Sequence, residues 1–449
     1  MRYDAIVLGG GPAGEHCAGH LAEGGAKVAL VERELVAGEC SYYACIPSKT
    51  LLRPGEALAA ARRTAGVAEA VCGPLSVAEV LAYRDYMVSD YSDAGQVAWL
   101  EETGIDLIRG DGRIAGAGRV AIGGGAHKAD HIVLATGSDP VFPPIPGLAE
   151  LDGVWTNREA TAVKEIPRRL LVLGGGPVGV EMAQALRRLG AQVTIVEGMD
   201  HVLAREPQAL GEALGEVLRR DSIELVLGMH AIEAARDGDD YVLTMEDGSE
   251  LRGDKLLVAT GRRPRVDVGL DTIGVYPDPR GIPVDDRMAV AGADGVWAIG
   301  DCNGVWPLTY VGKYQGRVAA ANILGRPARA SYEAVPRVVF TDPQAASVGE
   351  SEGAFTATIP LSQVPRTATY TTAWDEGPDF MTLVSDGERL TGAYALGPEA
   401  GEWLQQATLA IRARVPLEVL RDTIQPFPTF SEAFLFALAK LESPAMVAA

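Results

Sequence analysis

Two cysteines, Cys40 and Cys45, are the residues of this sequence best suited to redox chemistry. They lie in the segment GECSYYACIPSK, and no other two of the five cysteines are so close in sequence. Side chains four or five positions apart approach each other at helical geometry, and Pro47 limits rearrangement of the backbone just beyond them. As metal ligands they would need two further Cys or His at suitable spacing, and none is evident. We therefore expect a dithiol that can close into a disulfide, and no metal site.

A glycine-rich segment near the N-terminus has the spacing of a dinucleotide-binding turn. The apolar residues 5–8 lead into Gly9, Gly11 and Gly14, and a helix-like stretch then precedes a second strand that ends at Glu32. In such a motif the first glycine allows a tight turn, the second lets the backbone meet a pyrophosphate, and the third permits close packing of the helix. Glu32 is expected to accept the hydroxyls of a ribose.

The same construction recurs in the middle of the chain. Gly174, Gly176 and Gly179 follow an apolar strand, and the next strand ends at Glu197. The carboxylate of Glu197 favours the free ribose hydroxyls of NAD and repels the additional phosphate of NADP. Arg205 lies further along and could soften this preference. One chain is therefore expected to bind two dinucleotides.

Three further strands end in small or acidic residues. Two of them end in Ala-Thr-Gly, at Thr136–Gly137 and at Thr260–Gly261, and a third closes on Asp301. Small residues at a strand end suit a close approach of the backbone to a bound nucleotide or a neighbouring domain. Strands alternating with helices around these motifs predict an α/β protein.

From about residue 335 the pattern changes. Short alternating strands at residues 337–340, 380–384 and 390–396 are followed by helix-like stretches at 399–412 and 417–422, and then by a last amphipathic helix. This order predicts a separate α+β domain.

Composition excludes several classes of partner. The length of 449 residues suggests about three domains. Forty basic residues against 60 acidic ones give a net charge of -20, which opposes binding to nucleic acid and to anionic membrane surfaces. No stretch approaches the roughly 18 apolar residues of a membrane span, and the first residues resemble a strand more than a signal peptide. We expect a cytoplasmic protein with neither a nucleic-acid nor a membrane partner.

The order of these motifs resembles the class I pyridine nucleotide-disulfide oxidoreductases, the family of dihydrolipoamide dehydrogenase, glutathione reductase and mercuric reductase. The resemblance covers nearly the whole chain, through to AIGD at residues 298–301 and VFTDP at residues 339–343. It implies two Rossmann-like dinucleotide-binding domains plus a C-terminal α+β dimerisation domain. The implied boundaries are an FAD-binding domain at 1–146 and 269–330, an NAD(P)-binding domain at 147–268 and a dimerisation domain at 331–449.

The resemblance also implies roles for individual residues. Cys45 is implied to be the charge-transfer thiol beside the flavin, and Cys40 the thiol that exchanges with the substrate. Lys49 is implied to lie near flavin N5 and to pair with Glu181, and Asp301 to hold the ribityl-pyrophosphate region. The implied cofactors are FAD and NADH, with NADPH less favoured. Further cofactor contacts are expected at Thr136, Gly137 and Gly261.

The C-terminal segment departs from the family's pattern. The family usually carries His-Pro-Thr-x-x-Glu, in which the His is the acid–base catalyst, oriented by the Glu and donated across the dimer. This chain reads FPTFSE, so Phe427 occupies the His position, Glu432 is retained, and no His follows His230. Acid–base assistance is worth about 10²- to 10⁴-fold, so its loss slows dithiol–disulfide exchange unless another group serves. The candidate replacements are Tyr42, Tyr43, Tyr310 and Glu432 itself.

Three functions are compatible with this pattern. The first is an enzyme that passes hydride from NADH through flavin to the Cys40–Cys45 disulfide and on to a small-molecule disulfide. The second passes electrons from flavin to a quinone, with Phe427 lining an apolar pocket. The third is a non-enzymatic flavin-binding protein, against which the retained dithiol argues. We expect the first, in the homodimer that the resemblance implies; mercuric reductase is disfavoured because it carries C-terminal cysteines, and the last cysteine here is Cys302.

Overall fold

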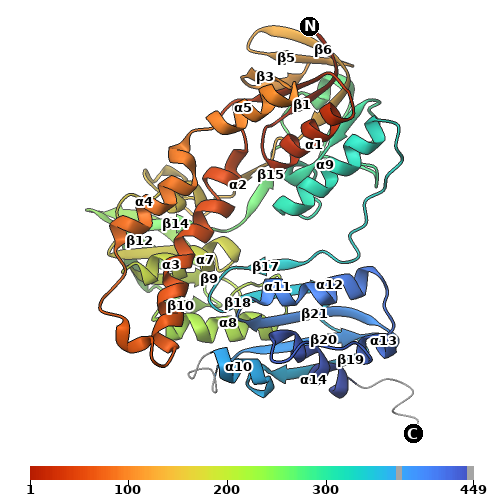
Figure 1. The fold of residues 1–449 in the computed structure, drawn as a ribbon. Helices are drawn as coiled ribbons and strands as arrows, with labels where there is room; N and C mark the ends of the chain where they lie inside the picture. Colours follow the sequence, from red (N-terminus) through yellow and green to blue (C-terminus); the bar gives the residue numbers. More distant parts are fainter. Residues whose placement is uncertain (371–376, 442–449) are drawn as a thin grey trace. The chain divides into compact units, whose positions relative to one another are not determined.

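The computed structural model describes residues 1–370 and 377–441, which form two compact units (Figure 1). Both units combine strands with helices, so the predicted α/β class is confirmed. Over the described residues, the helices are too short or too polar to cross a lipid bilayer. The first unit comprises Met1–Pro47, Tyr83–Val141 and Gly261–Ser331, and the second Ser48–Ala82, Phe142–Thr260 and Tyr332–Ala449.

The first unit is built on a seven-stranded sheet. Its central strand β1 (Arg2–Leu8) pairs in parallel with β2 (Val28–Glu32) on one side and with β6 (Gly125–Leu134) on the other. Residues 5–8 are buried, as expected for a parallel strand covered on both faces. The remaining strands are β3 (Asp106–Arg109), β4 (Gly112–Ile114), β5 (Arg119–Ile122) and β16 (Val296–Ala298).

Helices α1 (Pro12–Glu23) and α9 (Thr309–Ile323) pack side by side in the first unit (Figure 1). A Cβ at Gly316 of α9 would come within 2.8 Å of the carbonyl oxygen of Ala13, so this approach requires a glycine. Helix α5 (Ala94–Thr103) also lies in the first unit, whereas α4 (Val77–Met87) begins in the segment assigned to the second unit.

The second unit contains a four-stranded parallel sheet. Its strand order is β10 (Glu224–Leu227), β9 (Gln192–Glu197), β8 (Arg169–Leu173) and β14 (Lys255–Val258). The helices α7 (Pro177–Arg188) and α8 (Gln208–Arg220) connect these strands and share an apolar core with them. A three-stranded antiparallel sheet lies in the same unit, formed by β11 (Ala231–Asp237), β12 (Asp240–Met245) and β13 (Glu250–Gly253).

The C-terminal part of the second unit is a five-stranded antiparallel sheet in the order β17-β18-β21-β20-β19. The strands are β17 (Arg337–Val339), β18 (Gln344–Gly349), β19 (Phe355–Pro360), β20 (Phe380–Ser385) and β21 (Leu390–Gly397). The helices are α10 (Pro365–Tyr370), α11 (Ala400–Trp403), α12 (Gln405–Arg412), α13 (Leu417–Arg421) and α14 (Ala433–Lys440). The structure therefore has the predicted mixture of strands and helices, with two strands, β18 and β19, that the sequence pattern did not indicate.

The helix-like stretch predicted at residues 399–412 is present as two short, consecutive helices. Glu399 has φ +54°, so helical geometry begins after it, and α11 and α12 meet at Leu404. The hydrogen bond from the Thr408 N–H to the Leu404 carbonyl is long, at 3.4 Å, which marks the weak joint between the two helices.

Candidate active site

Cys40 and Cys45 both lie in the first unit, but on two consecutive helices, so continuous helical geometry does not relate them. Cys40 is in α2 (Gly38–Tyr42), whereas Cys45 is the first residue of α3 (Cys45–Arg63). Helical geometry is interrupted at Tyr43, where φ is -135°. The two side chains nevertheless hydrogen bond to each other, and neither sulfur is in a disulfide. The turn between the helices therefore brings the predicted dithiol together.

The Thr309 hydroxyl contacts both thiols. Its Oγ1 lies 3.4 Å from the Cys40 sulfur and 3.4 Å from the Cys45 sulfur. The hydrogen bond to Cys45 and burial raise the pKa of the Cys40 thiol, whereas the Thr309 hydroxyl and the Lys313 ammonium lower it. Sequence analysis missed Thr309 because nothing local relates the start of α9 to cysteines more than 260 positions earlier.

A chain of hydrogen bonds connects Asp301 with the residue before Cys40. The Ser138 hydroxyl donates to the Asp301 carboxylate at 2.6 Å. The Arg262 guanidinium donates to the Ser138 oxygen at 2.8 Å and to the Glu39 carboxylate at 2.7 Å. Both Ser138 and Arg262 were missed in the sequence, although each directly follows an Ala-Thr-Gly segment. Asp301 is thus tied to the helix that carries the first cysteine.

The first glycine motif forms a tight strand-to-helix turn. Gly9 has φ +108°, and a Cβ on it would lie 2.2 Å from the carbonyl oxygen of Ala135. A Cβ at Gly14 would lie 1.9 Å from the Gly9 carbonyl oxygen, so the backbone itself excludes side chains at both positions. Gly11 differs: it precedes the first residue of α1, and a Cβ there would meet nothing within 4 Å. The open space beside a helix N-terminus fits a pyrophosphate.

The second glycine motif repeats this geometry. Gly174 also has φ +108°, and a Cβ at Gly179 would lie 2.0 Å from its carbonyl oxygen. Gly176 precedes the first residue of α7, and the nearest atom to its Cβ would be the Ala259 carbonyl oxygen at 4.0 Å. The second motif therefore offers the same open space for a pyrophosphate.

The acids that end β2 and β9 are held in the same way. The Glu32 carboxylate accepts the N–H of Gly10 at 2.7 Å, and the Glu197 carboxylate accepts the N–H of Gly175 at 2.7 Å. A second N–H, two residues after each acid, donates to its other oxygen, at 2.7 Å in the first motif and 3.0 Å in the second. Both carboxylates are therefore fixed at the turn where a ribose is expected.

The remaining predicted cofactor contacts lie beside a two-stranded ladder. Thr136 and Gly137 join β6 to β7 (Ser138–Pro140), and Gly261 precedes β15 (Arg262–Pro264). Strands β7 and β15 pair in antiparallel fashion. This ladder brings the ends of the two Ala-Thr-Gly segments together.

Lys49 and Glu181 form an ion pair in the second unit. The Lys49 Nζ lies 2.7 Å from Oε2 of Glu181, and the Phe340 N–H donates to Oε1 at 2.9 Å. The Lys49 ammonium also lies 4.6 Å from the centre of the Phe340 ring, a cation–π contact. Both carboxylate oxygens of Glu181 therefore have a partner.

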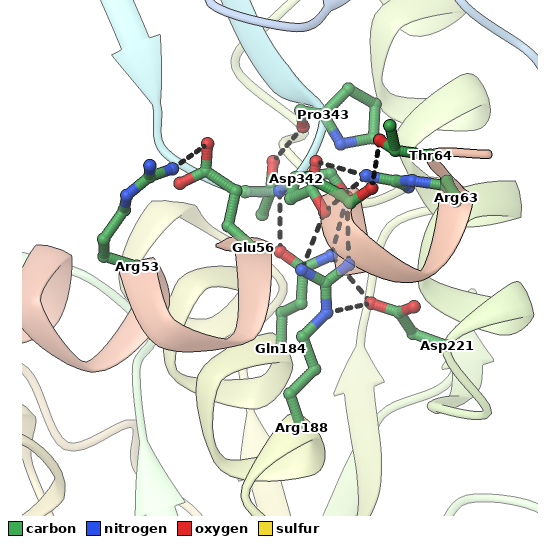
Figure 2. A network of polar contacts seen from close by, with 11 residues as sticks. Arg53, Glu56, Arg63, Thr64, Gln184, Arg188, Asp221, Asp342 and Pro343 are labelled. Atoms are coloured by element: carbon green, nitrogen blue, oxygen red, sulfur yellow. Dashed lines mark hydrogen bonds and ion pairs between the residues drawn. The ribbon is translucent and has the colours of Figure 1, made fainter. Parts of the chain in front are cut away.

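Polar contacts hold the Asp342 loop against α7 (Figure 2). Gln184, one helical turn after Glu181, accepts the N–H of Asp342 at 2.8 Å and donates to its carbonyl at 3.0 Å. Arg188, a further turn along α7, binds the carboxylates of Asp342 at 2.8 Å and Asp221 at 2.9 Å. Successive turns of α7 thus fix the loop whose backbone donates to Glu181.

Two of the groups considered as replacements for the missing His, Glu432 and Tyr42, form hydrogen bonds to other residues. The Glu432 carboxylate is buried and accepts the N–H of Thr429 at 3.2 Å. Burial raises the pKa of Tyr42 to about 12, and its hydroxyl bonds to the Gln96 side chain at 3.1 Å. Phe427 is 74% exposed in the single chain. Tyr42 therefore keeps its proton at neutral pH, and Glu432 acts locally at the start of the C-terminal helical segment.

The chain is similar in sequence to enzymes of one family. The pattern described as pyridine nucleotide-disulphide oxidoreductase matches residues 3–316, and that of the family's dimerisation domain matches residues 335–437. A dihydrolipoyl dehydrogenase of Thermus scotoductus is 35% identical over 462 residues, covering 99% of this chain and 98% of that protein. A mercuric reductase of Shigella flexneri is 36% identical over 455 residues, covering 96% of this chain and 79% of that protein.

The chain is also similar in fold to solved structures. The Cu(II) complex of the HOCl-induced flavoprotein disulfide reductase RclA from Escherichia coli has a TM-score of 0.87 at 26% identity, covering 98% of this chain and 100% of that chain. LpdA from Mycobacterium tuberculosis has a TM-score of 0.85 at 26% identity, covering 98% and 99%. These findings confirm the resemblance seen in the motifs and make the chain an oxidoreductase, against the non-enzymatic alternative. By sequence and by fold, the chain belongs to the FAD-dependent pyridine nucleotide-disulphide oxidoreductases, which use NAD(P)H.

Proposed function

We propose that the protein is a homodimeric, NADH-dependent reductase that passes electrons through the Cys40–Cys45 pair to a small-molecule disulfide. The observation that carries this proposal is the contact of both thiols with one hydroxyl, that of Thr309. The hydroxyl donates to the Cys40 sulfur and also contacts the Cys45 sulfur, so the two thiols are held close enough to close into a disulfide during exchange. The match to the dimerisation domain supports the homodimer. Five cysteines in 449 residues are too few for a disulfide scaffold, which supports a cytoplasmic location as part of this proposal.

The two glycine motifs support FAD and NADH as the bound dinucleotides. Gly11 and Gly176 would admit the pyrophosphates, and Glu32 and Glu197 would accept ribose hydroxyls. When bound, FAD supplies the redox group that takes a hydride from the nicotinamide and delivers an electron pair to the disulfide. We assign FAD to residues 1–146 and 269–330, NADH to 147–268 and dimerisation to 331–449.

The thiols carry out the substrate half of the reaction. The Cys40 thiolate attacks one sulfur of the substrate, so the substrate disulfide breaks and a mixed disulfide forms. Cys45 then attacks the Cys40 sulfur, which releases the second half of the substrate and closes the Cys40–Cys45 disulfide. The substrate gains two electrons and two protons, and the dithiol loses them. Phe427 cannot donate a proton, so we propose that the leaving thiolates take their protons from water or from another group of the site.

A metal ion that binds thiolates is the second candidate acceptor. Mercuric reductases are among the relatives, and RclA is described as a Cu(II) complex. A dithiol is a suitable pair of soft ligands for such an ion.

The experiment that tests the proposal compares acceptors in one assay. NADH oxidation is followed with lipoamide, with Cu(II) and with the quinone menadione, for the wild type, Cys40→Ser and the control Cys72→Ser, which removes an exposed thiol. Rapid reduction of lipoamide that is lost only in Cys40→Ser supports the disulfide reductase. Reduction of Cu(II) alone, with the same dependence on Cys40, supports the second candidate. Reduction of menadione alone, retained in Cys40→Ser, overturns both in favour of the quinone reductase.

A further inference from the structure

We propose that the Lys313 ammonium stabilises the Cys40 thiolate and so serves as a positioning residue for the exchange reaction. The role of Lys313 in exchange rests on the proposed disulfide reductase function. Its test measures the reactivity of Cys40 and does not require the enzyme to reduce a substrate. All the residues involved lie in the first unit.

The geometry of α9 directs Lys313 toward the dithiol. Thr309 and Lys313 are four positions apart on α9, so they share one face of the helix. Side chains on a helix lean toward its N-terminus, and a long side chain covers the turn before its own Cα. A long side chain at position 313 is therefore expected to extend toward the turn that carries Thr309, whose hydroxyl lies 3.4 Å from both sulfurs.

The packing of α1 against α9 completes the surroundings of Lys313. Gly312 and Gly316 flank Lys313 on α9, and a Cβ at either would come within 3.1 Å of Ala13. This close approach brings the first turns of α1, with Glu15 and His16, to the same region. The Lys313 charge acts on Cys40, Glu15 and His16; His20 in turn interacts with His16, and Tyr42 with Glu15.

The electrostatics of these groups agree with the geometry. Lys313 lowers the pKa of the Cys40 thiol, against the raising effects of Cys45 and burial. Burial raises the pKa of Glu15 to about 7, and Lys313 opposes that rise. Burial lowers the pKa of His16, and Lys313 lowers it further. No carboxylate of the described residues lies within ion-pair distance of Lys313, so its charge is not cancelled by a direct partner.

Two substitutions are expected to act in opposite directions. Lys313→Met removes the cation and disfavours the thiolate. Glu15→Gln removes the anion that competes for the same cation and favours the thiolate. A merely structural role for either residue does not predict opposite signs. Lys313→Arg keeps the charge on a side chain of similar length, so the Cys40 thiolate is expected to be as stable as in the wild type.

The test is the pH dependence of alkylation of Cys40. The FAD-loaded protein is reduced with a phosphine, so the thiols are free whether or not NADH reduces them. Iodoacetamide is added between pH 6 and 10, and modification of Cys40 is quantified by peptide mass spectrometry. The control is Arg317→Met, which removes an exposed cation one turn further along α9.

Alkylation of Cys40 at pH 7 is expected to slow about three- to tenfold in Lys313→Met and to accelerate in Glu15→Gln, because the thiolate is the reactive form. Arg317→Met and Lys313→Arg are expected to stay near the wild type. Unchanged alkylation in Lys313→Met, or equal slowing in Arg317→Met, would overturn the proposal. Thermal unfolding and FAD content identify a variant that has lost its fold. If Lys313→Met is such a variant, the alkylation rate of Lys313→Arg, expected to equal that of the wild type, tests the proposal instead. If the alkylation rates change as expected but the enzyme reduces no disulfide, the proposed function is wrong and the role of Lys313 stands.

Discussion

The Lys49 ammonium and the Glu181 carboxylate are 2.7 Å apart, but they are buried to very different extents. The side chain of Glu181 is 6% exposed, whereas that of Lys49 is 35% exposed. Removing one partner therefore has unequal consequences, because a buried charge without a partner is costly and a hydrated one is not. Loss of Lys49 should therefore destabilise the fold more than loss of the Glu181 charge.

This asymmetry predicts the stabilities of the two single variants. Lys49→Met leaves a buried carboxylate with only the Phe340 N–H and the distant Ser48 hydroxyl, and we expect a loss of about 2–3 kcal/mol in the free energy of unfolding. Glu181→Gln keeps an acceptor for that N–H and leaves a solvated ammonium, so about 1 kcal/mol or less is expected. Urea unfolding of both variants and of the double variant measures the difference. Equal losses in the two single variants would contradict the burial argument.

Glu197 is expected to set the choice of nicotinamide cofactor. Its carboxylate is fixed by the N–H groups of Gly175 and Met199, so its charge stays where a 2′-phosphate would be. In Glu197→Gln we expect the ratio of kcat/KM for NADH over NADPH to fall about tenfold or more, since the repulsion is removed. The control is Arg205→Met, which is expected to weaken NADPH use further if Arg205 receives the phosphate. An unchanged ratio in Glu197→Gln would refute the assignment.

Asp379 makes the folded protein sensitive to pH. Both of its carboxylate oxygens are buried without a hydrogen bond, and burial raises its pKa to about 8 although Arg63 and Arg220 oppose the rise. The folded state therefore keeps a proton that the unfolded chain releases near pH 4. Stability contributed by this proton is present below that pH and is lost as pH rises toward 8.

We expect the free energy of unfolding of the wild type to fall by up to about 1.4 kcal/mol per pH unit between pH 5 and 8 through this group. Asp379→Asn should remove most of that slope. Asp386→Asn is the matched control, because hydrogen bonds from the Arg389 and Glu388 N–H groups outweigh burial and hold the pKa of Asp386 below its usual value. Denaturant unfolding at several pH values measures the slopes. A slope that persists in Asp379→Asn would show that another group is responsible.

Phe427→His tests whether the missing imidazole limits exchange. In the family's pattern this position carries the acid–base catalyst, so we expect lipoamide reduction to rise, by up to about 10²-fold. The gain should depend on a group with a pKa near 6.5. Phe427→Gln, which is polar but does not titrate there, is the control. An equal gain in both variants would indicate relief of steric hindrance and not acid–base catalysis.

Local sequence patterns were sufficient for the dinucleotide-binding motifs. The predicted strand at residues 192–197 is β9 with the same bounds, and Glu32 and Glu197 lie at the glycine turns as the motif requires. These features are predictable because a few contiguous residues fix them: a strand, a glycine with positive φ and a helix N-terminus.

Residues that depend on distant contacts were not predictable in this way. Thr309 meets the dithiol from α9, and Arg262 reaches Glu39 across 223 positions. Neither residue has a local signature, because a Thr that begins a helix and an Arg after a glycine are common. The break between the two cysteine-bearing helices was also missed, since spacing alone does not distinguish one helix from two that meet at a turn.

The two glycine motifs separate constraints imposed by the chain from constraints imposed by its ligands. Alanine at Gly9, Gly14 or Gly179 would collide with backbone atoms, so in a mutational scan these positions should be intolerant even in an assay of abundance. Alanine at Gly11 would meet no protein atom, so that position should tolerate it for abundance and lose fitness only when dinucleotide binding is selected. Comparing the two selections would reveal where each dinucleotide lies, from the tolerance of single glycines alone.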